Sequence, residues 1–115
     1  FNVNVTDNFE KDMDLYQKEE VQNIEEDVLG LVEELSEGNL IGDEIKNLQL
    51  SKGEHTFKVR VANSDLKVGK SNGYRVIYYV IRDDMEIFLL TIYSKKDRED
   101  ISSDDILRLI HLYCV

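Results

Sequence analysis

The alternation of apolar and polar positions predicts a short strand at the start of this 115-residue chain. In residues 1–5, Phe and Val alternate with Asn, the period-2 pattern of a strand with one buried face. A helix over residues 8–18 is predicted next, because Asp7 and Glu10 have capping-box spacing and apolar residues then recur at helical intervals.

A second helix is predicted from the apolar positions that follow. From Val21 they keep a spacing of three and four residues as far as Gly38, a residue type that often ends a helix. Residues 39–56 lack such a period, so we expect a connection with at most one helical turn near residues 43–48.

Three strands are predicted in the second half of the chain. Residues 57–61 alternate apolar with basic, and a polar loop over residues 63–73 follows. Residues 74–81 and 86–93 are β-rich runs joined by a four-residue turn, which predicts a hairpin. Apolar residues nearly fill both faces of these runs, so at least one is expected to be a central strand covered on both sides.

A charged loop over residues 95–100 separates the last strand from a final helix. Ser102 and Asp105 form a second capping box at the start of that helix. The predicted order is β-α-α-β-β-β-α, with no repeat or linker. We therefore expect one α+β domain over residues 1–115, built on a small, mainly antiparallel twisted sheet.

Composition limits where this chain works. Hydrophobic residues make up 42% of it, enough for a core, yet no apolar stretch approaches the roughly 20 residues needed to span a bilayer. No membrane partner is expected. The single cysteine excludes an internal disulfide framework and a Cys-based zinc cage, and no secretory signal is seen, so a cytoplasmic location is predicted.

The net charge of −10 at first argues against a nucleic-acid partner, but the charge is unevenly distributed. Residues 1–56 hold 15 acidic and 4 basic residues, whereas residues 57–115 hold 9 and 10. Residues 57–78 hold five bases and one acid. An acidic first half is thus joined to a local cationic patch, and we interpret the acidic helix positions as solvated surface rather than as a metal site.

Three motifs do not support a site. Gly69–Ser71 resembles the end of a phosphate-binding P-loop, but Ser64 stands where that motif needs glycine and the segment leads into a strand. His55 and His111 lie on separate predicted elements, so they are interpreted as ordinary surface or packing residues. Cys114 has no recognisable partner for nucleophilic catalysis.

Basic residues on the predicted strands form the stronger candidate site. Lys58 and Arg60 project from one face of their strand, roughly 7 Å apart at about 3.3 Å per residue. Arg75 joins them if the next strand pairs with theirs. Three further bases follow the last strand: Lys95, Lys96 and Arg98. Such a group could hold a phosphate, or could simply keep an edge strand soluble.

Residues 57–60, 69–78 and 89–96 together resemble the RelE/ParE superfamily of bacterial toxins from toxin–antitoxin modules. The most specific segment is Gly-Tyr-Arg-Val-Ile-Tyr at residues 73–78, directly after a basic strand. The helix pair, long loop, strand block and final helix also come in the order of that family, so the resemblance covers most of the chain.

The resemblance implies a compact sheet with a helix pair packed on one face and a C-terminal helix. It also implies a cognate antitoxin as partner, with a toxin–antitoxin heterotetramer as one possible assembly. RelE-like members cleave messenger RNA in the ribosomal decoding site, whereas ParE-like members inhibit DNA gyrase. Cleavage through the RNA 2′-hydroxyl needs a base, cations around phosphorus and an acid, but no metal or other cofactor.

Residue by residue, the resemblance implies that Lys58, Arg60 and Arg75 are catalytic, and that Lys96 replaces a family arginine. Arg75 suits stabilisation of the phosphorus centre, since its charge is permanent and its donors are forked. Lys58 could be base or acid if neighbouring cations lower its pKa. Four further residues are expected to contact RNA or its phosphates: Lys95, Arg98, Lys70 and Tyr93.

RNA-cleaving members often carry a tyrosine near the start of the last helix, where this chain has Ser102. Tyr93 or a lysine is then left as the candidate base. The leading hypothesis is a ribosome-dependent mRNA endonuclease. The retained basic set counts against gyrase inhibition, while the acidic surface and missing tyrosine keep an inactive antitoxin-binding homologue as an alternative.

Overall fold

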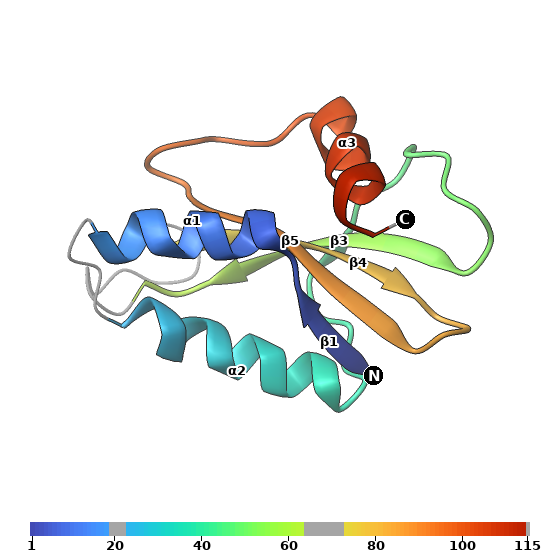
Figure 1. Cartoon of the computed structure of the whole chain (residues 1–115), viewed down its shortest axis with the longest axis horizontal. Helices are drawn as coiled ribbons and strands as arrows, with labels where there is room; N and C mark the ends of the chain where they lie inside the picture. The colour runs from blue at the N-terminus through green and yellow to red at the C-terminus, as the bar shows by residue number, and fades with distance from the viewer. Residues whose placement is uncertain (19–22, 64–72, 115) are drawn as a thin grey trace.

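A five-stranded sheet forms the centre of the protein, with strand order β1-β5-β4-β3-β2 (Figure 1). β1 runs parallel to β5, and the other neighbours are antiparallel. The computed structural model describes residues 1–18, 23–63 and 73–114. Its elements are β1 (Asn2–Val5), α1 (Asp7–Lys18), α2 (Ile24–Ser36), β2 (Asp43–Glu44), β3 (Glu54–Val61), β4 (Tyr74–Ile81), β5 (Glu86–Ser94) and α3 (Ser103–Tyr113).

The helices cover the two faces of the sheet unequally. α1 and α2 pack on one face, where Phe9 and Leu31 meet the inward residues Val59 and Val76 in the larger core cluster. α3 packs on the other face through a smaller cluster that includes Ile106. Figure 1 shows α2 and α3 on opposite sides of the sheet. The predicted α+β domain is confirmed, and no described helix is long and apolar enough to cross a membrane.

Several sequence-based expectations are confirmed at the level of single residues. Gly38 follows Glu37, the C-cap residue of α2, and adopts a φ of +90°. Its N–H donates to the Leu35 carbonyl at 3.0 Å, a helix-ending geometry that favours glycine. Ser102 caps α3 by accepting from the Asp105 N–H at 3.1 Å. β4 is buried over all but its last residue, as a central strand covered on both faces should be.

The prediction for residues 39–56 is wrong in two respects. Asp43 and Glu44 form the short strand β2, not a helical turn, and pair with Lys58 and Phe57 of β3. β3 also begins at residue 54, three residues earlier than predicted. The reason is that Thr56, a polar residue, is fully buried and occupies an inward position that an apolar pattern does not reveal.

The predicted start of the first helix is also corrected. Thr6, not Asp7, caps α1, because its Oγ1 accepts from the Phe9 N–H at 3.2 Å. The predicted start of the second helix at Val21 lies outside the described residues, as does most of the predicted loop over residues 63–73.

A register shift in the β4–β5 hairpin determines which residues face α3. Ile77 pairs with Thr91 but Tyr78 pairs with Leu89, so Leu90 is an extra residue on β5. Beyond this bulge, Tyr93 lies opposite Arg75. An uninterrupted hairpin would have placed the preceding residue there and turned the tyrosine to the other face.

Beyond the end of β1, polar side chains of α1 form hydrogen bonds with the main chain of β5. Asn8 Nδ2 donates to the Leu90 carbonyl at 2.9 Å, Asp12 Oδ2 accepts from the Ile92 N–H at 3.2 Å, and Tyr16 OH accepts from the Ser94 N–H at 2.6 Å. These three residues are spaced by four, so one face of the helix follows the strand edge. The contacts fix the end of β5, from which the charged loop departs.

Candidate functional site

Three residues form a row across the sheet on the face that carries α3. Arg60 of β3 lies opposite Arg75 of β4, and Arg75 lies opposite Tyr93 of β5. Lys58 shares this face two residues earlier on β3, as alternation along a strand requires. The structure therefore brings together three of the four predicted catalytic residues and one of the predicted RNA contacts.

The two arginines of the row have different environments. Arg60 is exposed, whereas only 6% of Arg75 is accessible to solvent. The Arg75 guanidinium donates from Nη1 to the Tyr74 carbonyl at 3.3 Å. Arg75 thus lies beneath the site as a buried cation, while Arg60 can meet a ligand directly.

Gly73 explains why a glycine precedes the Tyr-Arg pair. A Cβ on this residue would lie 2.2 Å from the Val61 carbonyl oxygen, a distance that no side chain can adopt. The Gly73 carbonyl also accepts from the Lys95 N–H at 3.1 Å. The glycine therefore lets β3 approach β4 at the start of the row and connects the end of β5 to them.

The charged loop after β5 closes one side of the row. The Asp100 carboxylate lies 3.4 Å from Lys58 Nζ, and the same oxygen accepts from the Ile101 N–H at 2.8 Å. Arg98 donates from Nε to the Asp100 carbonyl at 3.0 Å and places its guanidinium 5.9 Å from the centre of the Tyr93 ring. The loop thereby brings one more cation and one carboxylate to the site.

Tyr93 is buried, with only 4% of it exposed. Burial raises the pKa of its hydroxyl, as does the Asp100 charge, while Arg75 and Arg98 act in the opposite direction. The hydroxyl has no hydrogen-bond partner among the described residues. A buried phenol with a raised pKa is poorly suited to be the base.

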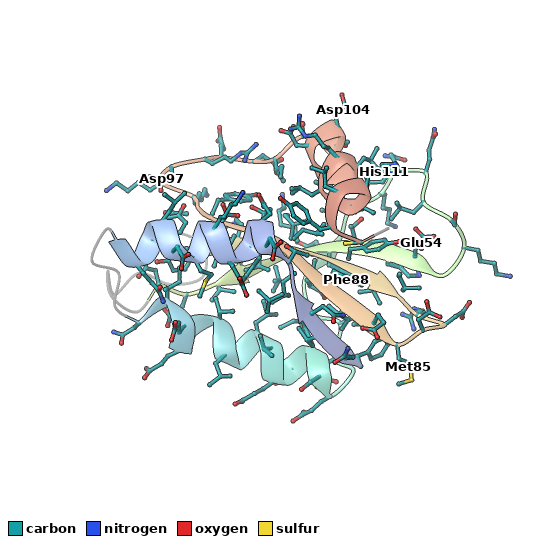
Figure 2. All side chains as sticks on the ribbon, viewed as in Figure 1. Glu54, Met85, Phe88, Asp97, Asp104 and His111 are labelled. Carbon is teal, nitrogen blue, oxygen red and sulfur yellow. The ribbon has the colours of Figure 1, made fainter. Side chains whose placement is uncertain are left out.

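Other predicted contacts lie to one side of the row or outside the described residues. Lys95 and Lys96 are exposed in the turn after β5, and the Lys96 N–H donates to Ser94 Oγ at 3.2 Å. Asp97 follows them and accepts from Tyr16 OH at 3.0 Å, near the end of α1 (Figure 2). Lys70 belongs to a segment outside the described residues.

The residues rejected from sequence do not form a site in the structure. His55 Nδ1 lies 2.9 Å from Glu44 Oε2 on β2, and this hydrogen bond lowers the pKa of Glu44. His111 lies on α3 (Figure 2). Burial raises the pKa of the Cys114 thiol to about 12, which leaves it protonated and unreactive at neutral pH.

Asp100 is the functional candidate that sequence analysis missed. It was counted only as part of a charged loop, and it contacts a lysine 42 positions earlier in the chain. The available signal was its position two residues before the Ser102 helix cap, in the same loop as Lys95, Lys96 and Arg98. A comparison with models of protein families gives no match, and a comparison with curated protein sequences gives none either.

Proposed function

We propose that this chain is the toxin of a bacterial toxin–antitoxin module and cleaves messenger RNA bound to the ribosome in the cytoplasm. The observation that carries the proposal is the row of Arg60, Arg75 and Tyr93, with Lys58 beside it. The four side chains lie on one face of the sheet, although they come from three different strands. A group of cations on one face is suited to stabilising the negative charge that develops around phosphorus during cleavage.

The solvent exposure of each basic side chain determines the role that it can have in the site. Arg60 and Lys58 reach solvent and can bind phosphate oxygens directly, whereas the buried Arg75 contributes a fixed positive potential from below. In the cleavage step the 2′-hydroxyl loses its proton, O2′ bonds to phosphorus and the P–O5′ bond breaks. Positive charge around phosphorus stabilises this transition state most, because negative charge accumulates there.

Ribosome dependence follows from the distribution of charge. A chain of net charge −10 holds free RNA weakly, since affinity for RNA comes largely from phosphate neutralisation. The ribosome fixes the message, so only a few phosphates need to be met by the local cations. α2, whose first turn carries Glu25, Glu26 and Asp27, packs on the face of the sheet opposite the row.

Growth arrest provides the first test of the proposal. Expression of the wild-type chain should arrest growth, and Arg60→Ala should relieve the arrest, because Arg60 is exposed and its loss leaves the core intact. Arg82→Ala, at an exposed arginine in the hairpin turn, is the matched control and should remain toxic. Message cleavage in the arrested cells supports the proposal, whereas blocked DNA supercoiling supports gyrase inhibition.

The proposal includes a cognate antitoxin as partner. The product of the neighbouring reading frame should co-purify with this chain and restore growth when the two are expressed together. No arrest by the wild-type chain, together with stable binding of that partner, would instead identify an inactive antitoxin-binding homologue.

A further inference from the structure

The base for RNA cleavage is the missing part of the site described above. Tyr93 is buried, with the Arg98 guanidinium over its ring, and Lys58 Nζ is already engaged in an ion pair with Asp100. Ser102 is committed to the helix cap of α3. None of these three groups is free to take a proton from a ribose hydroxyl at the face of the sheet.

We infer that Asp100 is the general base of this site. The inference rests on the proposed function and deepens it. Asp100 is the acidic residue that the described structure places in contact with Lys58, and its side chain is 65% exposed, so substrate can reach it. Oδ1 is used by Lys58 Nζ and by the Ile101 N–H, whereas no contact among the described residues engages Oδ2.

The position of Asp100 is fixed from several directions. Arg98 holds its main-chain carbonyl, and the adjoining Ile101 is buried against the sheet in the α3-side core. The carboxylate contacts Lys58 of β3, and its charge acts on the Tyr93 hydroxyl of β5. On α3, Asp105 is occupied by both Arg98 and Arg108.

The proton balance of the reaction uses the Lys58–Asp100 pair. Asp100 takes the 2′-hydroxyl proton while the O2′–P bond forms, the P–O5′ bond breaks, and O5′ takes a proton from Lys58 Nζ. The products are a 2′,3′-cyclic phosphate and a 5′-hydroxyl. When the products leave, the carboxyl and the neutral amine meet again at 3.4 Å and proton transfer restores the ion pair.

Substrate entry must open this ion pair, because in-line displacement places base and acid on opposite sides of phosphorus. The two side chains are 35% and 65% exposed, and such exposed pairs contribute little to stability. The phosphate also compensates Lys58 for the contact that it gives up. The closed pair is therefore compatible with an active site that opens when RNA binds.

Single-turnover cleavage of message on programmed ribosomes tests the inference. Asp100→Asn keeps the size of the side chain and an acceptor for the Ile101 N–H, and should cleave on the order of a hundredfold or more slowly. Asp43→Asn is the matched control: Asp43 is exposed and lies opposite Lys58 on β2, but the structure shows no contact between their side chains. It should cleave at the wild-type rate.

The pH profile distinguishes a base from a structural role. A carboxylate base is already ionised between roughly pH 6 and pH 8, so the wild-type rate should be level there. In Asp100→Asn, hydroxide must replace the base, so the residual rate should rise about tenfold for each unit of pH. A slower variant with a level profile overturns the assignment of Asp100 as base.

The remaining outcomes are also decisive. An unchanged rate in Asp100→Asn overturns the assignment of the base but leaves the proposed function standing. A faster variant overturns it as well, and shows that the carboxylate competes with the phosphate for Lys58. No cleavage by the wild-type chain overturns the proposed function, and the assignment of Asp100 with it.

Discussion

Arg60 and Arg75 lie directly opposite each other on β3 and β4, so two permanent positive charges share one face of the sheet. Like charges at opposed positions destabilise a sheet. Arg60 is exposed to solvent, whereas Arg75 is buried, so solvent screens the charge of Arg60 more than that of Arg75. On the proposed function, a phosphate bound above Arg60 should relieve that repulsion.

Arg60→Met should therefore stabilise the fold while impairing function. We expect the free energy of unfolding to rise by about 0.2–1 kcal/mol, because the opposed charge is removed and the aliphatic stem is kept. Message cleavage should fall by roughly a hundredfold or more. Urea unfolding and cleavage on ribosomes measure the two effects. Arg82→Met, in the hairpin turn, should change neither, and a destabilised Arg60→Met protein would contradict this account of the pair.

Replacement of Arg75 should affect both stability and cleavage, because Arg75 is buried. Sequence alone predicts a polar sheet position whose replacement leaves the fold intact, but only 6% of the residue is exposed. Arg75→Ala should therefore lower the free energy of unfolding by about 2–4 kcal/mol as well as abolish cleavage. Arg75→Met fills more of the space, so it should recover part of the stability and none of the activity. Cleavage by a folded Arg75→Met protein would show that the buried charge is not needed.

The α1 contact at the edge of β5 predicts a dependence of stability on pH. Burial raises the pKa of Asp12 above its ordinary value of 3.8, and hydrogen bonds from Thr91 and Ile92 offset part of that shift. The folded state therefore holds this proton more tightly than the unfolded state. The stability that this protonation contributes is present below pH 3.8 and is lost as the pH rises through the raised pKa.

Urea unfolding at a series of pH values checks this sign. The stability of wild type relative to Asp12→Asn should fall as the pH rises from 3.8 and then level off. Asp14→Asn, at an exposed position of the same helix, is the matched control for the loss of one carboxylate. A wild-type protein that gains stability relative to Asp12→Asn over this range would contradict the direction of the shift.

The sequence is informative where a local pattern decides the structure. The alternation around Lys58 and Arg60, the glycine after α2 and the Ser102 cap depend on neighbours along the chain, and each is observed as predicted. β2 and the start of β3 were missed, because Thr56 is buried without being apolar. A local pattern cannot reveal a burial that only the packed sheet creates.

The site needed information that no local pattern contains. The extra residue Leu90 shifts the register of β5, and this shift places Tyr93 opposite Arg75. The contact between Asp100 and Lys58 joins two segments that are distant in sequence, and only the tertiary fold brings them together. Sequence therefore identified most of the cations, whereas the structure supplied their order and the carboxylate beside them.

The most direct test compares cleavage of one message in two settings at physiological salt. The purified chain, freed of adventitious metal with a chelator, is added to the message on translating ribosomes and to the same RNA in free solution, and cuts are mapped by primer extension. The account predicts cuts within the translated region on ribosomes, with 2′,3′-cyclic phosphate ends, and little cleavage of free RNA. Robust cleavage of free RNA would contradict ribosome dependence, and no cleavage in either setting would contradict the nuclease itself.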